Sequence, residues 1–262
     1  MEALTTFFAN IDWFEIWLAT GDTLLMLGGS LLFTVLLGLP LGVLLFLCSP
    51  RQLLEAKGVY AMLSLVVNIL RSLPFIILLI VMIPFTVLIT GTSLGVAGAI
   101  PPLVVNILRS LPFIILLIVM IPFTVLITGT SLGVAGAIPP LVVGATPFFA
   151  RLVETALREV DRGIIEATQS MGATTRQIIT NALLPEARPG IFAAITVTAI
   201  TLVSYTAMAG VVGAGGLGDL AIRFGYQRFQ TDVMVVTVVL LLVLVQVLQT
   251  VGDKLVVHFS RK

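Results

Sequence analysis

The side chains that could do chemistry are concentrated in one stretch of this sequence, residues 151–189, which holds five arginines, four glutamates and one aspartate. The chain has a single histidine, His258, and a single cysteine, Cys48. A histidine zinc helix, Ser-His-Asp catalysis and an internal disulfide are therefore not expected. The glycine-rich segment 213–218 follows no predicted strand and precedes no Lys-Ser/Thr, so it is not a P-loop. We expect no catalytic residue, no metal and no cofactor.

The polar stretch predicts two short helices on either side of Gly172. Asp161 is a suitable cap for the first helix, and Gly172 can end it. Thr174 and Gln177 have the spacing of a capping box for the second helix, which Pro185 is expected to end. One side of each helix is apolar. Such a pair needs a partner surface, or it lies as an amphipathic hairpin on lipid.

The composition of the chain indicates which elements position the polar stretch 151–189. Apolar residues make up 58 % of the 262-residue chain and charged residues only 10 %, whereas soluble domains carry roughly 25 % charged residues. A net charge of +1 gives no basic surface for nucleic acid. A membrane-crossing helix needs about 20 apolar residues, and these runs contain no charge: 23–50, 72–108, 110–150, 189–218 and 233–252. The pattern predicts an all-α membrane protein with several spans.

The distribution of charge also predicts the orientation. Residues 1–22 carry four acids and no base, so we expect an interfacial N-terminal segment, with Trp13 and Trp17, on the outer face. The remainder, 23–262, forms the transmembrane domain, whose first span is 23–48. The arginine-rich stretch 151–189 and the C-terminus are expected on the cytoplasmic side.

An internal repeat is exact: Leu65–Val105 is identical to Leu103–Val143, with an offset of 38 residues. The two copies, 65–102 and 103–140, are each long enough for two short crossings. We expect crossings at 73–90, 92–108, 111–129 and 131–150, with turns at Arg71, Arg109 and Arg151 on the inner side. This gives five core spans plus two from the duplicated unit. An extruded or re-entrant copy is the alternative.

The polar stretch resembles the EAA loop of ABC-importer permeases. Glu166-Ala167-Thr168, then Gly172, then Ala182-Leu183-Leu184-Pro185 has the spacing of that motif. Thr168 and Ala182 depart from it mildly. The resemblance implies a polytopic helical permease of the type I importer kind, in which the loop 161–186 couples the spans to an ATP-binding subunit. The coupling residues would be Glu166, Ala167, Gly172, Ala182, Leu184 and Pro185, and the apolar side of the loop would lie in a groove of that subunit.

A second resemblance is to the methionine-importer permeases, through Ser204–Gly210 and Gly213–Gly218. It implies a homodimer in a bacterial inner membrane, an extracytoplasmic methionine-binding protein and ATP hydrolysis by the partner alone, so the permease is not an enzyme. Met208, Tyr205 and Ser204 are candidates for a gate or pathway wall, against ordinary core packing as the alternative. Methionine-importer permeases normally have five spans and no repeat, so the 38-residue duplication is the feature in which this chain differs from them.

Four alternatives compete with this interpretation. A permease for another small amino acid would share every feature above. An ion-coupled secondary transporter usually places carboxylates within its spans, and the clearest spans here contain none. A membrane enzyme would lack catalytic groups, and a passive channel or scaffold would differ by needing no ATPase.

Overall fold

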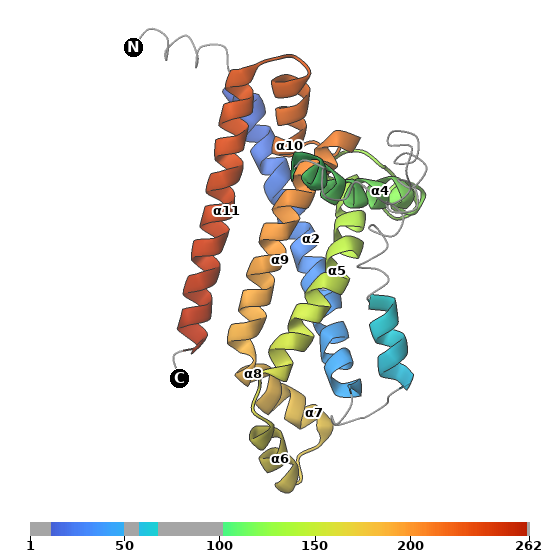
Figure 1. The fold of residues 1–262 in the computed structure, drawn as a ribbon, viewed down its shortest axis with the longest axis vertical. Coiled ribbons are helices and arrows are strands. Elements are labelled where there is room, and N and C mark those ends of the chain that lie inside the picture. Colours follow the sequence, from blue (N-terminus) through green and yellow to red (C-terminus); the bar gives the residue numbers. More distant parts are fainter. Residues whose placement is uncertain (1–11, 50–57, 68–101, 261–262) are drawn as a thin grey trace.

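The computed structural model describes residues 12–49, 58–67 and 102–260, of which 102–112 are described by backbone alone. Within this part of the chain the fold is a helical bundle (Figure 1). Four described helices are long and apolar enough to cross a membrane: Trp13–Cys48, Gly133–Arg158, Arg188–Val212 and Thr231–Ser260. Shorter apolar helices are Gly58–Val67 and Phe113–Thr128. The expected all-α membrane architecture is confirmed.

The first span, α2 (Trp13–Cys48), begins ten residues before the expected start at residue 23. Oδ1 of Asp12 accepts hydrogen bonds from the backbone N–H groups of Phe14 (3.0 Å) and Glu15 (3.3 Å) and so caps the helix. Helical structure is continuous across residue 22, where the interfacial segment was expected to give way to the span. Trp13 and Trp17 are 53 % and 76 % exposed on its first turns.

The expected turn at Arg109 is wrong, because Pro102–Thr128 forms one continuous helix, α4. A single charged residue does not interrupt an apolar run that contains no glycine. The helix ends instead at Gly129, the first glycine after it, which has a φ of 77°. In Figure 1, α4 lies across the end of the bundle that holds α10. The expected crossing 73–90 and most of 92–108 lie outside the described residues.

The scaffold of the bundle is the close pair of α2 and α5 (Gly133–Arg158). A Cβ atom at Gly42 would lie 2.6 Å from the carbonyl oxygen of Ala150. Only glycine permits this backbone approach, which is how small residues stabilise helix pairs in lipid. The neighbouring helix α9 (Arg188–Ala209) packs on both, and α11 (Thr231–Ser260) packs on α9.

The glycine-rich segment 213–218 forms a tight turn. It connects η2 (Gly210–Val212) to α10 (Gly216–Leu220) and η3 (Ala221–Tyr226). Gly213, Gly215 and Gly216 all have positive φ, a backbone region that residues with a Cβ rarely enter. Beside this turn, Arg223 forms ion pairs with Asp219 (3.1 Å) and Glu15 (3.4 Å), which ties η3 to the start of α2.

Candidate functional site

The polar stretch folds as two helical segments that protrude at the end of the bundle opposite α10 (Figure 1). The first is α6 (Arg162–Ser170). The second is α7 (Thr175–Gln177), which continues through η1 (Ile178–Leu183) into α8 (Leu184–Glu186). We call Asp161–Glu186 the coupling segment, after the function that the sequence predicts for it.

Both ends of α6 are capped as the sequence predicts. Oδ1 of Asp161 accepts a hydrogen bond from the backbone N–H of Gly163 at 2.9 Å. At the other end Gly172 has a φ of 77°, its N–H donates to the Gln169 carbonyl (2.9 Å), and the Ala173 N–H donates to the Thr168 carbonyl (3.2 Å). These two bonds form a Schellman motif. The turn between the two helical segments is therefore fixed by backbone geometry.

The second helical segment has the predicted capping box. The Gln177 side chain accepts from the Thr174 backbone N–H at 2.8 Å, and the Gln177 N–H donates to Oγ1 of Thr174 at 3.4 Å. The expected end at Pro185 is displaced, because helical structure continues to Glu186. The π-helical turn η1 precedes Pro185, which occupies the first turn of α8, where its missing N–H costs little.

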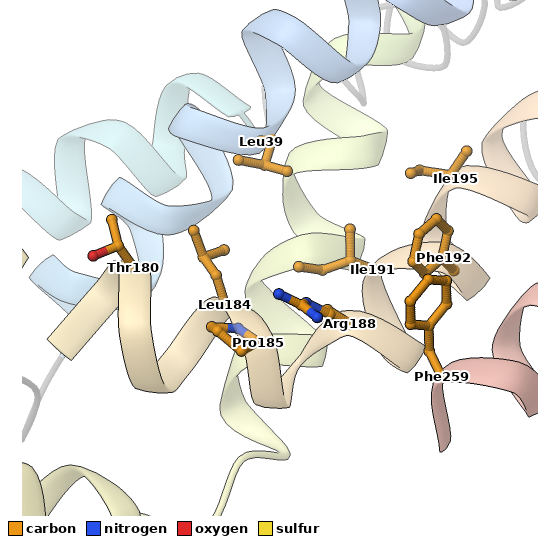
Figure 2. A pocket seen from close by; sticks show the side chains of 9 residues that line it. All are labelled: Leu39, Thr180, Leu184, Pro185, Arg188, Ile191, Phe192, Ile195 and Phe259. Carbon is orange, nitrogen blue, oxygen red and sulfur yellow. The ribbon is translucent and has the colours of Figure 1, made fainter. Parts of the chain in front are cut away.

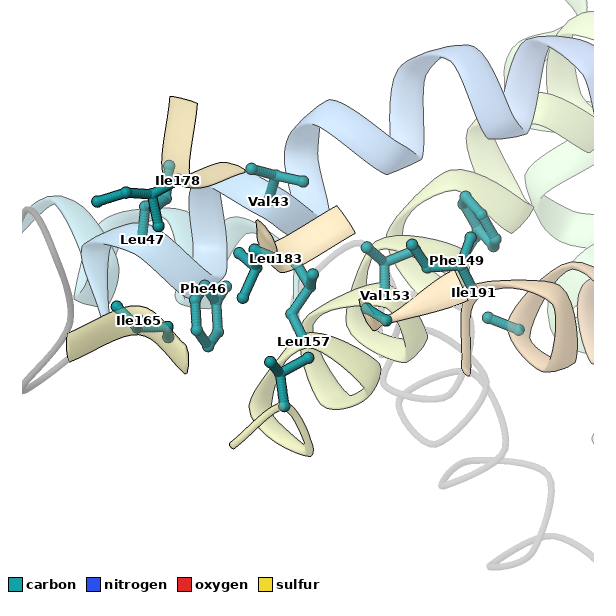
Figure 3. Packing of buried hydrophobic residues seen from close by; sticks show 13 residues of the cluster. Val43, Phe46, Leu47, Phe149, Val153, Leu157, Ile165, Ile178, Leu183 and Ile191 are labelled. Atoms are coloured by element: carbon teal, nitrogen blue, oxygen red, sulfur yellow. The ribbon is translucent and has the colours of Figure 1, made fainter. Parts of the chain in front are cut away.

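The apolar side of the coupling segment is buried against its own spans (Figure 3). Ile165, Ile178 and Leu183 are at most 7 % exposed and pack in one cluster with residues of α2 and α5. The remaining members of this cluster are Val43, Phe46, Leu47, Phe149, Val153, Leu157, Val160, Ala187, Ile191 and Ala194. The expectation that this side contacts a partner is wrong for Ile165, Ile178 and Leu183, because these three side chains are buried within the chain.

What faces solvent is the opposite side and the turn. Glu166, Ala167 and Gly172 are exposed, whereas Ala182, Leu184 and Pro185 are half-buried. Met171, beside Gly172 in the chain, is 78 % exposed. The reason is that α6 ends at Ser170 and Met171 is its C-cap, outside the helical repeat. Met171 is thus an exposed apolar side chain at the tip of the coupling segment.

A buried polar cluster lies at the end of α5 that leads into the coupling segment. Glu154 is only 2 % exposed. Its carboxylate pairs with Arg151 at 2.5 Å and with Arg158 at 2.8 Å. It also accepts a hydrogen bond of 3.3 Å from the hydroxyl of Tyr60, and Arg151 donates to Ser64 at 2.5 Å. The sequence pattern assigns residues 151–158 to the polar loop, but they are the last turns of α5. The i, i+3 and i, i+4 spacing of Arg-Glu-Arg is the signal that indicates helix.

The three gate candidates lie on α9, far from the coupling segment. The tyrosine ring of Tyr205 stacks on Phe113 of α4, with centroids 4.2 Å apart and an interplanar angle of 5°. Met208 is half-buried and packs against the buried hydrophobic cluster that contains Phe113. Ser204 is exposed. From Arg188 to Met208 the helix rises by about 30 Å. The two regions are connected through α9 and not by direct contact.

The described residues hold no group of three or more His, Cys, Asp or Glu that could bind a metal ion. Cys48 is a free thiol and 7 % exposed, so it packs as a small apolar side chain. The carboxylates of Glu154 and Asp161 are engaged in an ion-pair cluster and a helix cap. The chemistry available at the coupling segment is therefore binding through an exposed surface.

Comparison with known proteins gives consistent results. Residues 102–262 match the family described as binding-protein-dependent transport system inner membrane component. The chain is 46 % identical over 238 residues to a probable D-methionine transport system permease protein, MetI, of Vibrio cholerae, covering 91 % of this chain and 89 % of that one. It is 42 % identical to the methionine import system permease protein MetP of Bacillus subtilis, covering 94 % of each.

A solved structure is similar along nearly the whole chain. An inward-facing conformation of the MetNI methionine ABC transporter superposes with a TM-score of 0.78 at 41 % sequence identity. The superposition covers 96 % of this chain and 100 % of the matched one.

Proposed function

Because this chain belongs to the family of binding-protein-dependent transport system inner membrane components, we propose that Asp161–Glu186 couples its spans to an ATP-binding subunit. The chain is the permease subunit of a methionine ABC importer. It is a multi-pass inner membrane protein, and ATP hydrolysis belongs to a separate subunit. The permease works as a dimer.

The exposed tip of the coupling segment supports its proposed docking role. Met171 presents an apolar side chain to solvent beside Glu166 and Gly172. Flexible methionine side chains adapt to apolar grooves, and a few buried anchors carry most of the energy of a protein interface. We assign Met171 as the anchor that enters the ATP-binding subunit. Glu166 and Ala167 border it, while half-buried Ala182, Leu184 and Pro185 support the segment from within.

The burial of the apolar side gives the segment a means of transmitting force. Ile165, Ile178 and Leu183 pack on α2 and α5 in one continuous cluster. Packed cores resist deformation and move as units. Movement of the segment by the ATP-binding subunit would therefore displace the ends of these spans. Closure and opening of the two ATP-binding subunits would therefore move α5 and α9 as rigid bodies.

The pathway is assigned to the opposite region of α9. The segment Ser204–Gly210 carries small residues, which permit close helix contacts, and it leads into the glycine-rich turn. Met208 and Tyr205 would change their packing against α4 as the two permease copies separate and close. In this proposal the N-terminal end of α2 and the glycine-rich turn would lie outside and would face an extracytoplasmic methionine-binding protein. The coupling segment and the end of α11 would then face the cytoplasm.

Uptake of labelled methionine tests the proposed coupling. Cells that lack their own importer would express this chain with an ATP-binding subunit and a binding protein. We expect uptake by the parent chain and loss of uptake in Glu166→Ala and Met171→Glu, both of which remain in the membrane. Unchanged uptake in both variants would contradict the coupling assignment. Uptake of another small amino acid in preference to methionine would contradict the substrate alone, so the two failures are distinguishable.

A further inference from the structure

A groove of about 360 Å³ lies between α2, the coupling segment, α9 and α11 (Figure 2). Its volume is within the range of ligand pockets, roughly 300 to 1,000 Å³. The stacked rings of Phe192 and Phe259, with centroids 4.6 Å apart, form one wall. Leu39 of α2 and Ile195 of α9 line its inner part, and all four of these side chains are apolar.

Two of the side chains that line the groove carry polar groups. Arg188 and Thr180 line it near the coupling segment, whereas Ile195 lies seven residues further along α9, a rise of about 10 Å. In Figure 2 the guanidinium group of Arg188 lies among the lining side chains, with Leu39 above it to one side and Ile195 above it to the other. A molecule that fits this arrangement has an anionic head and an apolar tail.

Arg188 is available for such a head. It is exposed, and within the described part of the chain its side chain has no ion pair and no hydrogen bond. Arg151, Arg158 and Arg223, by contrast, are each paired with a carboxylate. An unneutralised guanidinium that lines an apolar groove attracts a phosphate, and basic pockets between membrane helices are known to bind anionic lipid heads.

We propose that this groove binds one anionic phospholipid, with its phosphate on Arg188 and an acyl chain along Phe192 and Ile195. The walls come from α2, α9 and α11, which are long enough to cross the membrane, so the groove opens where lipid is present. The bound lipid would also touch Leu184 and Pro185 of the coupling segment. It would therefore connect this segment to the spans, and the importer would respond to the lipid composition of the membrane.

The test measures lipid retention and needs no transport, so its outcome is independent of the coupling assignment. The importer complex would be reconstituted in nanodiscs of phosphatidylglycerol and phosphatidylcholine, released, and analysed by native mass spectrometry. Arg188→Gln removes the charge, and Arg188→Lys keeps it. Lys254→Gln is the matched control, because Lys254 is an exposed cation near the same end of α11 and does not line the groove.

We expect the parent complex and Arg188→Lys to retain phosphatidylglycerol in preference to phosphatidylcholine. Arg188→Gln should retain about fivefold less phosphatidylglycerol, the effect of one basic side chain at an anionic lipid surface, and Lys254→Gln should retain as much as the parent. Equal retention by Arg188→Gln would overturn the proposal. Equal retention of both lipids by the parent would do the same. Loss of the permease dimer in Arg188→Gln with lipid retention unchanged would identify a second copy as the occupant instead.

Discussion

The backbone N–H of Leu217, in α10, donates a buried hydrogen bond of 2.9 Å to Oγ1 of Thr23, in α2. The Thr23 hydroxyl in turn donates to the Ala19 carbonyl at 2.9 Å. One hydroxyl thus both accepts and donates, and it holds the glycine-rich turn on the first span. Gly216 allows this contact, because a Cβ there would lie 2.7 Å from Oγ1 of Thr23.

Replacing Thr23 by valine should destabilise this end of the bundle. The N–H of Leu217 would remain buried without an acceptor, at a cost of about 1–3 kcal/mol. We expect a lower thermal unfolding midpoint in detergent for Thr23→Val, and a midpoint near that of the parent for Thr23→Ser, which keeps the hydroxyl. Equal midpoints for the valine and serine variants would show that the hydrogen bond contributes nothing.

Two glycines of the coupling segment form a matched pair for testing its turn. Gly172 has a φ of 77°, and a Cβ added there would have no atom within 4 Å, so Gly172→Ala introduces backbone strain alone. The left-handed conformation costs a residue with a Cβ roughly 1–2 kcal/mol. Gly163→Ala meets only ordinary contacts at 3.5 Å or more.

We expect Gly172→Ala to reduce methionine uptake severalfold and Gly163→Ala to leave it nearly unchanged. Membrane levels of both variants would be measured in the same cells. If both variants transport equally well, the geometry of the turn does not matter for coupling.

The ion-pair cluster on α5 predicts a large effect of removing its carboxylate. Glu154→Ala would remove the buried carboxylate that Arg151 and Arg158 share, and we expect a cost of about 1–3 kcal/mol, because the two guanidinium groups left behind are partly exposed. Glu159→Ala is the control, because Glu159 is exposed at the end of the same helix. The expected result is a marked loss of folded protein for Glu154→Ala only, measured by size-exclusion chromatography with fluorescence detection. Similar yields of the two variants would show that the cluster is dispensable.

Because the two copies of the repeat are identical, the effect of removing one copy can be tested with a single shortened chain. Deleting 65–102 or deleting 103–140 gives the same shortened chain. That chain keeps every residue type that Phe113, Leu117, Ala137 and Leu141 contribute to the core around α4 and α5. We expect it to take up methionine at least as well as the full chain. A shortened chain that is present in the membrane and inactive would show that the extra unit is required.

Much of this fold follows from local sequence signals. The caps at Asp161, Gly172 and Thr174 agree with the sequence predictions, because each depends on a few neighbouring residues and on hydrogen bonds within one turn. The glycine-rich turn is predictable for the same reason. The charge-free runs identify the apolar helices, since their burial in lipid requires little more than length and composition.

The predictions that failed depend on tertiary packing. The sequence shows that Ile165 and Leu183 are on an apolar side, but it does not show whether that side meets a partner or the chain's own spans. The turn expected at Arg109 relied on the charge pattern, whereas the backbone continues as helix to the next glycine. The ion pairs of Glu154 with its neighbours in α5 become visible only once residues 151–158 are known to be helical.

The most direct test of the coupling assignment measures the affinity of the ATP-binding subunit for the permease. Met171→Glu places a charge at the exposed tip, whereas Met171→Leu keeps an apolar side chain of similar size. We predict that the glutamate variant binds the subunit at least about tenfold more weakly, as expected for loss of a central apolar anchor. The leucine variant should bind like the parent. A folded Met171→Glu permease that binds the subunit with parental affinity would contradict the account.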